Sequence, residues 1–140
     1  MPEAPAASIA LTMARTLRHR GPDRQDAEVL QLSHDRVLGL GHALLSIIGR
    51  NSEGRQPFHI QGGVLLFNGA IYNFRELGQE LQRAGIPLRT STDTEVLALG
   101  LAREGVGFLK KARGMYAFAF WDETRRTLML GRDPFGVKPL

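Results

Sequence analysis

No cysteine occurs among the 140 residues, and this absence excludes disulfides, zinc sites built from thiolates and a cysteine nucleophile within the sequence. Long apolar runs are also missing, since no stretch approaches the ~20 residues that a membrane-spanning helix requires. The first segment lacks the ordered basic region, apolar core and cleavage site of a secretory signal. We therefore expect a cytoplasmic protein that makes no contact with a membrane.

Histidines and clustered basic residues are too scattered to indicate a metal site or a nucleic-acid site. The four histidines lie far apart without a close pair of carboxylates, and His42 is expected to be a packed core residue. The formal charge is +4, but the densest basic group, residues 15–24, contains no interleaved aromatic residues. We expect a solvated basic face, with no metal, no cofactor and no nucleic-acid partner.

The residues that are present describe one globular domain. Hydrophobic residues make up 43% and charged residues 23% of the chain, and 140 residues can bury a moderate core. The expected elements follow in the order helix, strands, two helices and a hairpin. Because strands and helices do not alternate regularly, this order predicts an α+β fold with mainly antiparallel sheet.

The N-terminal part is expected to hold one amphipathic helix. Residues 1–7 are rich in proline and alanine and are predicted to be disordered. Ile9, Met13 and Leu17 recur at every fourth position. This spacing predicts a helix over 8–19 with one buried stripe, ended by the Gly-Pro pair that follows.

Short apolar runs then predict a series of strands. Those at 27–32 and 36–48 are separated by a turn signal and are expected to pair. Residues 49–63 are predicted to be a loop that includes one short strand. The run 64–67 is predicted to be a strand that ends at an Asn-Gly pair.

Two helices with capping signals come next. Asn73 with Glu76, and Thr92 with Glu95, have the spacing of a capping box, which predicts helices beginning at 73 and 93. A glycine ends each of them.

An alternating segment over 114–133 predicts a hairpin, with Tyr116, Phe118 and Phe120 on one face and small residues on the other. Arg132 and Asp133 are expected to form an ion pair or a turn near its end.

Six short motifs, each weak alone, occur together in one order. They are LRHRGPD (17–23), LGHALLSII (40–48), FNGAIYNFREL (67–77), TDTEV (92–96), RGMYAFAFWDE (113–123) and GRDPFGVKPL (131–140). This order and spacing resemble those of the class II glutamine amidotransferase domain, and more narrowly the amino-terminal domain of glutamine-dependent asparagine synthetases. The resemblance implies that residues 8–140 form a partial domain with an Ntn-hydrolase fold, in which antiparallel sheets lie between helical layers, incomplete at both ends.

The resemblance also implies a glutamine site. In the family the Asn side chain and the Gly backbone N–H of the FNG segment form an oxyanion hole, which corresponds to Asn68 and Gly69; the alternative for this pair is a tight turn. Asp93 would face the α-amino group of the substrate. The substrate-binding positions carried over are Leu44, Leu45, Ser46, Ile47, Ile48, Asn68, Gly69, Ala70 and Asp93.

Three departures from the family pattern bear on activity. The family opens with Met-Cys-Gly and a strand whose cysteine attacks the glutamine amide, whereas this sequence opens with Met1-Pro2-Glu3. Leu44 replaces an arginine that grips the glutamine α-carboxylate, and Ala70 replaces a glutamate that helps to hold the substrate. No residue is therefore assigned as catalytic. We predict a degenerate domain that does not hydrolyse glutamine and binds it weakly or not at all.

Two alternatives remain open. The chain could be a non-enzymatic module that docks on or regulates a separate synthetase, or a fragment of a longer active gene product with the cysteine strand encoded upstream. In the family, the ammonia released passes to an ATP-dependent synthetase domain, so such a protein is one candidate partner. Unpaired sheet edges make a homo-oligomer the other.

Overall fold

The structure is a computed structural model that describes residues 3–45 and 55–140. Its elements are α1 (Glu3–Thr16), β1 (Arg24–Ser33), β2 (Arg36–Leu44), β3 (Phe58–Ile60), β4 (Gly63–Ile71), α2 (Phe74–Arg83), α3 (Asp93–Glu104), the 3-10 helix η1 (Gly105–Lys110), β5 (Gly114–Asp122) and β6 (Thr127–Arg132). No helix within these ranges is long and apolar enough to cross a membrane.

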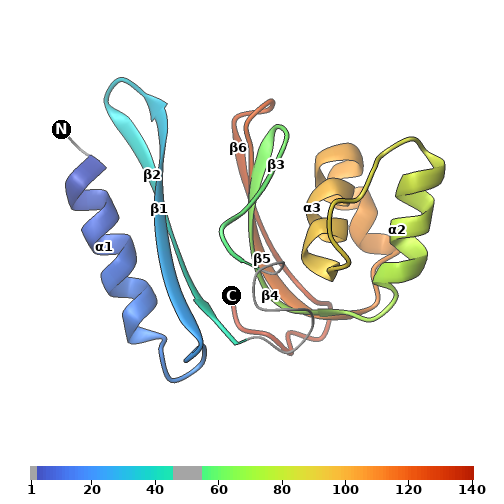
Figure 1. Cartoon of the computed structure of the whole chain (residues 1–140), viewed down its shortest axis with the longest axis horizontal. Helices are drawn as coiled ribbons and strands as arrows, with labels where there is room; N and C mark the ends of the chain where they lie inside the picture. The colour runs from blue at the N-terminus through green and yellow to red at the C-terminus, as the bar shows by residue number, and fades with distance from the viewer. Residues whose placement is uncertain (1–2, 46–54) are drawn as a thin grey trace.

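Four layers stack in the order helix, sheet, sheet, helices (Figure 1). α1 covers one face of a two-stranded sheet, β1-β2, and the other face of that sheet meets a four-stranded sheet. The second sheet has the order β3-β4-β5-β6, and α2 and α3 cover its far face. All strand pairs are antiparallel. The predicted α+β sandwich of antiparallel sheets between helical layers is confirmed.

Side chains that alternate along β4 and β5 enter two separate cores. On the face toward α2 and α3, Leu65 and Phe67 pack with Phe118 and Phe120, and none of the four is more than 4% exposed. Burying a side chain of this size stabilises a fold by ~1.5–3 kcal/mol. The aromatic face predicted for the hairpin is confirmed, because Tyr116 belongs to the same core.

A smaller core fills the space between the two sheets. Val64 of β4 and Trp121 of β5 meet Leu40 of β2 there. The partly buried residues around them are Leu30, Leu32, Leu38 and Leu66. Because alternate residues of a strand share one face, His42 and Leu44 continue the face of Leu40 toward the end of β2.

α1 does not pack through the predicted stripe. Ile9, Met13 and Leu17 are 60%, 64% and 45% exposed, whereas Ala10 and Ala14 are buried. The helix lies so close to β2 that a Cβ atom on Gly41 would be 2.5 Å from the carbonyl oxygen of Ala10. Small residues on both elements allow this approach, and the larger side chains are left on the outside.

α1 also begins earlier than predicted, at Glu3 instead of Ser8. The prediction of disorder is therefore wrong for residues 3–7. Alanine is the best helix former, and Pro5 lies in the first turn, where its missing N–H breaks no helical hydrogen bond.

The predicted strands of the first half are confirmed. β1 pairs with β2, starting three residues before the predicted 27, and β3 is the short strand expected within 49–63. β2 ends at Leu44, and residues 46–48 of the predicted strand lie outside the described residues.

The two predicted capping boxes form only in part. Thr92 accepts the backbone N–H of Glu95 through its hydroxyl, as expected, and α3 follows it. The Glu95 carboxylate, however, bonds the N–H groups of Arg89 and Thr90 instead of returning to Thr92. Asn73 precedes α2 without a side-chain cap, because its amide bonds the backbone of the segment that leads into β5.

Candidate functional site

The Asn68-Gly69 pair lies inside a strand. β4 continues to Ile71, with Asn68 opposite Ala117 and Gly69 opposite Tyr116 on β5. The tight turn and the strand end at residue 67 are therefore both wrong. The turn propensity of Asn-Gly is overridden because β4 pairs with β5 along its whole length.

Gly69 occupies a position that no side chain fits. Its φ is +148°, which other residues rarely adopt. A Cβ atom there would lie 2.1 Å from the carbonyl oxygen of Met115, on the paired strand. The pairing with β5 nevertheless continues without a break on either side of Gly69.

β3 pairs only with the first part of β4, on the side away from β5. Beyond β3, every second residue of β4 points its backbone N–H to this open side, which gives three N–H groups: those of Phe67, Gly69 and Ile71. The Phe67 N–H is bound by Gln56 Oε1 at 2.5 Å, and the Ile71 N–H is bound by Asp93 Oδ2 at 3.0 Å. The Gly69 N–H lies between them and has no side-chain acceptor in the described part of the chain. One donor is thus left open at the centre of this edge.

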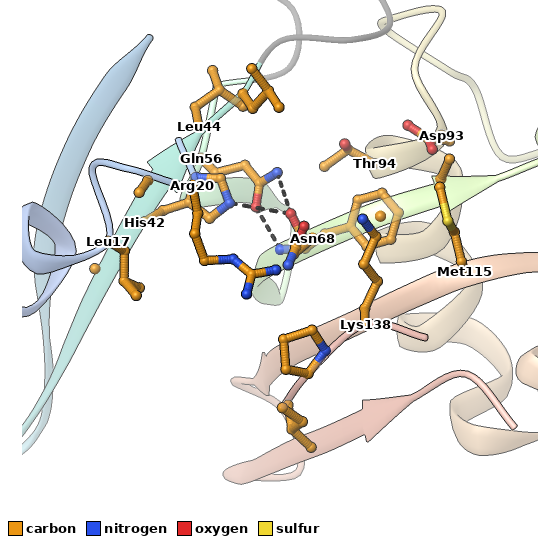
Figure 2. Close-up of a pocket in the computed structure, with 18 residues that line it drawn as sticks. Leu17, Arg20, His42, Leu44, Gln56, Asn68, Asp93, Thr94, Met115 and Lys138 are labelled. Carbon is orange, nitrogen blue, oxygen red and sulfur yellow. Dashed lines mark hydrogen bonds between the residues drawn. The ribbon is translucent and has the colours of Figure 1, made fainter. Parts of the chain in front are cut away.

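Gln56 and His42 fix the edge in place. Gln56, which is 4% exposed, also donates from Nε2 to the Phe67 carbonyl at 2.8 Å. Its amide therefore accepts from and donates to the backbone of one residue, as a paired strand would. His42 Nε2 lies 3.2 Å from the same oxygen and must donate, because a carbonyl can only accept. Figure 2 shows these bonds. The bond from His42 connects β2 to β4 across the space between the sheets.

A cavity of about 770 Å³ opens beside this edge. Its lining residues are Leu17, Arg20, Gly41, His42, Ala43, Leu44, Leu45, Gln56, Phe67, Asn68, Gly69, Ala70, Asp93, Thr94, Met115, Lys138, Pro139 and Leu140. Six of the nine predicted substrate-binding residues are brought together here. The other three, Ser46, Ile47 and Ile48, lie outside the described residues.

Leu44 and Ala70 form apolar parts of the wall. Asn68 and Ala70 point from β4 into the space between the sheets, since they alternate with the core residues Phe67 and Ile71. Leu44 faces this space from β2. Neither Leu44 nor Ala70 can make an ionic contact with a ligand.

Asp93 combines two roles at the other end of the cavity. It is the first residue of α3 and is 6% exposed, and its carboxylate holds the N–H of Ile71. Burial raises the pKa of Asp93, although backbone hydrogen bonds oppose this shift. Its predicted place beside Asn68 and Gly69 fits the cavity, which all three residues line.

Five polar residues of the cavity were not predicted as site residues: Arg20, His42, Gln56, Thr94 and Lys138. Arg20 and Lys138 belong to the motifs LRHRGPD and GRDPFGVKPL, which could have indicated them. Gln56 has no sequence signal, because its role depends on a contact with a strand 11 residues away. His42, expected in the core, is half-buried on the cavity wall.

The turn that carries Lys138 is built on Asp133. This buried carboxylate accepts the backbone N–H groups of Tyr116, Phe135, Val137 and Lys138. Although burial opposes ionisation, these hydrogen bonds lower the pKa of Asp133 to about 2. The turn is as predicted, and the alternative of an ion pair with Arg132 is not formed, since Arg132 donates to the Gly136 carbonyl.

His42 is expected to make the fold less stable in mild acid. Burial lowers its pKa below 6.5 and outweighs the hydrogen bond to Phe67, which raises it. The unfolded chain therefore binds a proton as the pH falls through 6.5, before the folded chain does, and stability falls by at most about 1.4 kcal/mol per pH unit. Urea unfolding at a series of pH values should show this slope in the native protein.

His42→Gln keeps a side-chain donor but cannot titrate, so it should flatten the slope between pH 6.5 and the lower folded-state pKa. His34→Gln, at an exposed turn, is the matched control for loss of a histidine. Equal slopes in the native and His42→Gln proteins would contradict a buried neutral imidazole.

Comparisons with known proteins identify the family of the chain. A family model described as a glutamine amidotransferase domain matches residues 2–140. The glutamine-hydrolysing asparagine synthetase 1 of Bacillus subtilis is 38% identical over 130 residues, which cover 91% of this chain and 20% of that protein. The glutamine-hydrolysing asparagine synthetase B of Escherichia coli is 36% identical over 133 residues, which cover 94% of this chain and 23% of that protein.

A solved structure is similar over almost the whole chain. The glutamine phosphoribosylpyrophosphate amidotransferase from Bacillus subtilis, complexed with ADP and GMP, has a TM-score of 0.67 at 24% identity. The match covers 98% of this chain and 36% of that one, and at this identity it shows the fold alone. The chain spans about one fifth of the length of the asparagine synthetases above. The family match confirms the predicted resemblance. The chain belongs to the glutamine amidotransferase domain family and is similar to asparagine synthetases.

Proposed function

We propose that the cavity is a glutamine site of the amidotransferase type that has lost part of its machinery. The observation that carries this proposal is the open Gly69 N–H, which lies between two satisfied N–H groups and faces a cavity shared with Asn68 and Asp93. A bound glutamine would place its side-chain carbonyl oxygen at Asn68 and Gly69. Its α-ammonium group would lie at Asp93.

Asn68 and Gly69 together form an oxyanion hole in this proposal. The Gly69 N–H is held by a paired strand, and the same strand carries the Asn68 amide, so the backbone needs no rearrangement when negative charge develops on the carbonyl oxygen. Removing one donor of this kind typically costs ~10²–10³ in rate. The buried Gln56 and Asp93 support the donors by fixing the strand on both sides.

The remaining parts of a glutaminase are not supplied by these residues. None of the 140 residues is a cysteine, so the sequence itself provides no thiol to attack the amide. Leu44 and Ala70 line the cavity where the family pattern has an arginine and a glutamate, so the substrate α-carboxylate would lack its main ionic partner.

The purified 140-residue chain is therefore expected to release no glutamate from glutamine above a protein-free blank. The measurement is a coupled assay for glutamate, with an active glutamine amidotransferase as the positive control. Steady turnover by the chain, proportional to its concentration, would refute the proposed loss of activity.

The partner of such a domain would be a synthetase. Two of the similar proteins named above are asparagine synthetases about four to five times as long as this chain. We infer that the domain acts with a synthetase domain, either within one polypeptide or as a separate docking module. Co-purification with a synthetase domain supports the second form, and its failure at micromolar concentrations counts against a separate module.

A further inference from the structure

Two basic side chains line the cavity without a partner. The guanidinium of Arg20 and the ammonium of Lys138 make no hydrogen bond or ion pair with the described residues, whereas other cations of the fold, such as Arg125 with Asp122, do. Figure 2 shows Arg20 and Lys138 on the two sides of Asn68. Among the described residues, the end of the cavity at Asn68 therefore carries two positive charges without a counter-charge.

Both cations are held by ordered backbone. The Lys138 N–H is bound by Asp133 Oδ2 at 3.1 Å, in the turn that this buried carboxylate organises. The Arg20 N–H is bound by the Leu17 carbonyl at 2.8 Å, and Gly21 follows in close contact with the backbone of β2. The backbone that carries each cation is thus ordered before a ligand arrives, so binding has to order only the two side chains.

The other titratable side chains at the cavity make its charge differ from one end to the other. Asp93 is the acidic side chain among the described residues of its lining, and in Figure 2 it lies beyond Lys138, on the side away from Arg20. His42 is on the wall, and burial lowers its pKa, so it adds no positive charge near neutral pH. A ligand that matches this arrangement carries a negative group at the Asn68 end and a positive group at the Asp93 end.

We propose that the cavity binds an acidic α-amino acid of the glutamate class in preference to its amide. The side-chain carboxylate would lie at Asn68 between Arg20 and Lys138, and the ammonium group would lie at Asp93. This orientation rests on the proposed function, which places the ligand side chain at Asn68. The neutral amide of glutamine gains nothing from the two cations, whereas a carboxylate forms charge-assisted hydrogen bonds with both.

The test is titration calorimetry at low salt with L-glutamate, L-glutamine and glutarate as separate ligands. Glutamate is expected to bind at least ~10-fold more tightly than glutamine, a difference of about 1.4 kcal/mol. Glutarate has both carboxylates but no ammonium, so it should bind more weakly than glutamate if Asp93 contributes. Added salt should weaken glutamate binding, because the contacts are ionic.

Variants locate the site. Arg20→Gln and Lys138→Gln should each weaken glutamate binding ~5–10-fold. Arg18→Gln and Lys110→Gln remove the same charges from exposed positions outside the cavity and should leave binding unchanged. Circular dichroism of each variant checks that the fold is retained.

Three results would overturn the proposal: no glutamate binding at ~20 mM, equal affinities for glutamate and glutamine, or equal losses in the cavity and control variants. Inorganic phosphate that binds as tightly as glutamate would also overturn it, since the cavity would then be a general anion site. These outcomes differ from failure of the proposed function, which is measured as glutamate release from glutamine.

Discussion

Glu95→Ala is expected to destabilise the fold more than any other single substitution considered, by about 3–5 kcal/mol. Glu95 is 1% exposed, and its carboxylate accepts both the N–H of Arg89, at 3.0 Å, and the N–H of Thr90, at 2.6 Å. It also accepts the Thr90 hydroxyl at 2.8 Å. Alanine would leave these donors without an acceptor and a small cavity at the start of α3.

The ionisation of Glu95 agrees with this role. Burial opposes the charged form, but the donors of Arg89 and Thr90 outweigh it and hold the pKa of Glu95 below 4.5. The carboxylate therefore stabilises the fold above pH 4.5, and this contribution is lost as the pH falls through the lower folded-state pKa. The alanine variant should lack this part of the acid-induced loss of stability.

Urea unfolding at neutral pH measures the effect on stability. A loss of about 3–5 kcal/mol is a large share of the ~5–15 kcal/mol that holds a domain together. Glu104→Ala is the matched control, because this exposed carboxylate on the same helix pairs with Lys111 at 3.1 Å and should cost less than about 1 kcal/mol. Similar losses in both variants would show that the loop before α3 does not depend on the buried carboxylate.

Hydrophobic periodicity predicted the elements that pack through large side chains. α2, α3 and the β5-β6 hairpin bury leucines and aromatic residues on one face, and their positions followed from the sequence. α1 is different, because it contacts β2 through alanines against glycines, and a hydrophobic pattern gives no signal for such backbone contact. The most hydrophobic stripe of α1 is therefore its exposed one.

The sequence predicted those cavity residues that belong to recognisable short motifs. Asn68, Gly69 and Asp93 belong to short motifs whose order resembles the family, and the structure brings them to one cavity. Gln56 and His42 could not be assigned, since both act by bonding the backbone of β4, a distant strand. The strand end predicted at residue 67, and the alternative of a turn at Asn68-Gly69, are wrong for a related reason, because strand pairing overrides local preference.

Leu44→Arg combined with Ala70→Glu is expected to create measurable glutamine binding. In the native chain a buried substrate carboxylate would lack an ionic partner, and losing one member of such a charge pair can cost ~2–5 kcal/mol. At about 1.4 kcal/mol per factor of ten, this weakens affinity by more than tenfold. We therefore expect no saturable glutamine binding by the native chain at low-millimolar concentration, and a gain of at least ~10-fold in the double variant.

The control for this gain is Leu44→Gln with Ala70→Gln, which adds polar bulk at the same positions without charge. Titration calorimetry should detect glutamine binding with the charged pair and not with the neutral pair, while neither variant releases glutamate, because neither contains a thiol.

Ala70→Glu alone should instead weaken glutamate binding, since its carboxylate would neutralise Arg20 or Lys138 in the same cavity. Tight glutamine binding by the native chain would mean that Leu44 and Ala70 do not mark the substrate carboxylate, and that the open N–H of Gly69 serves a ligand held in another orientation.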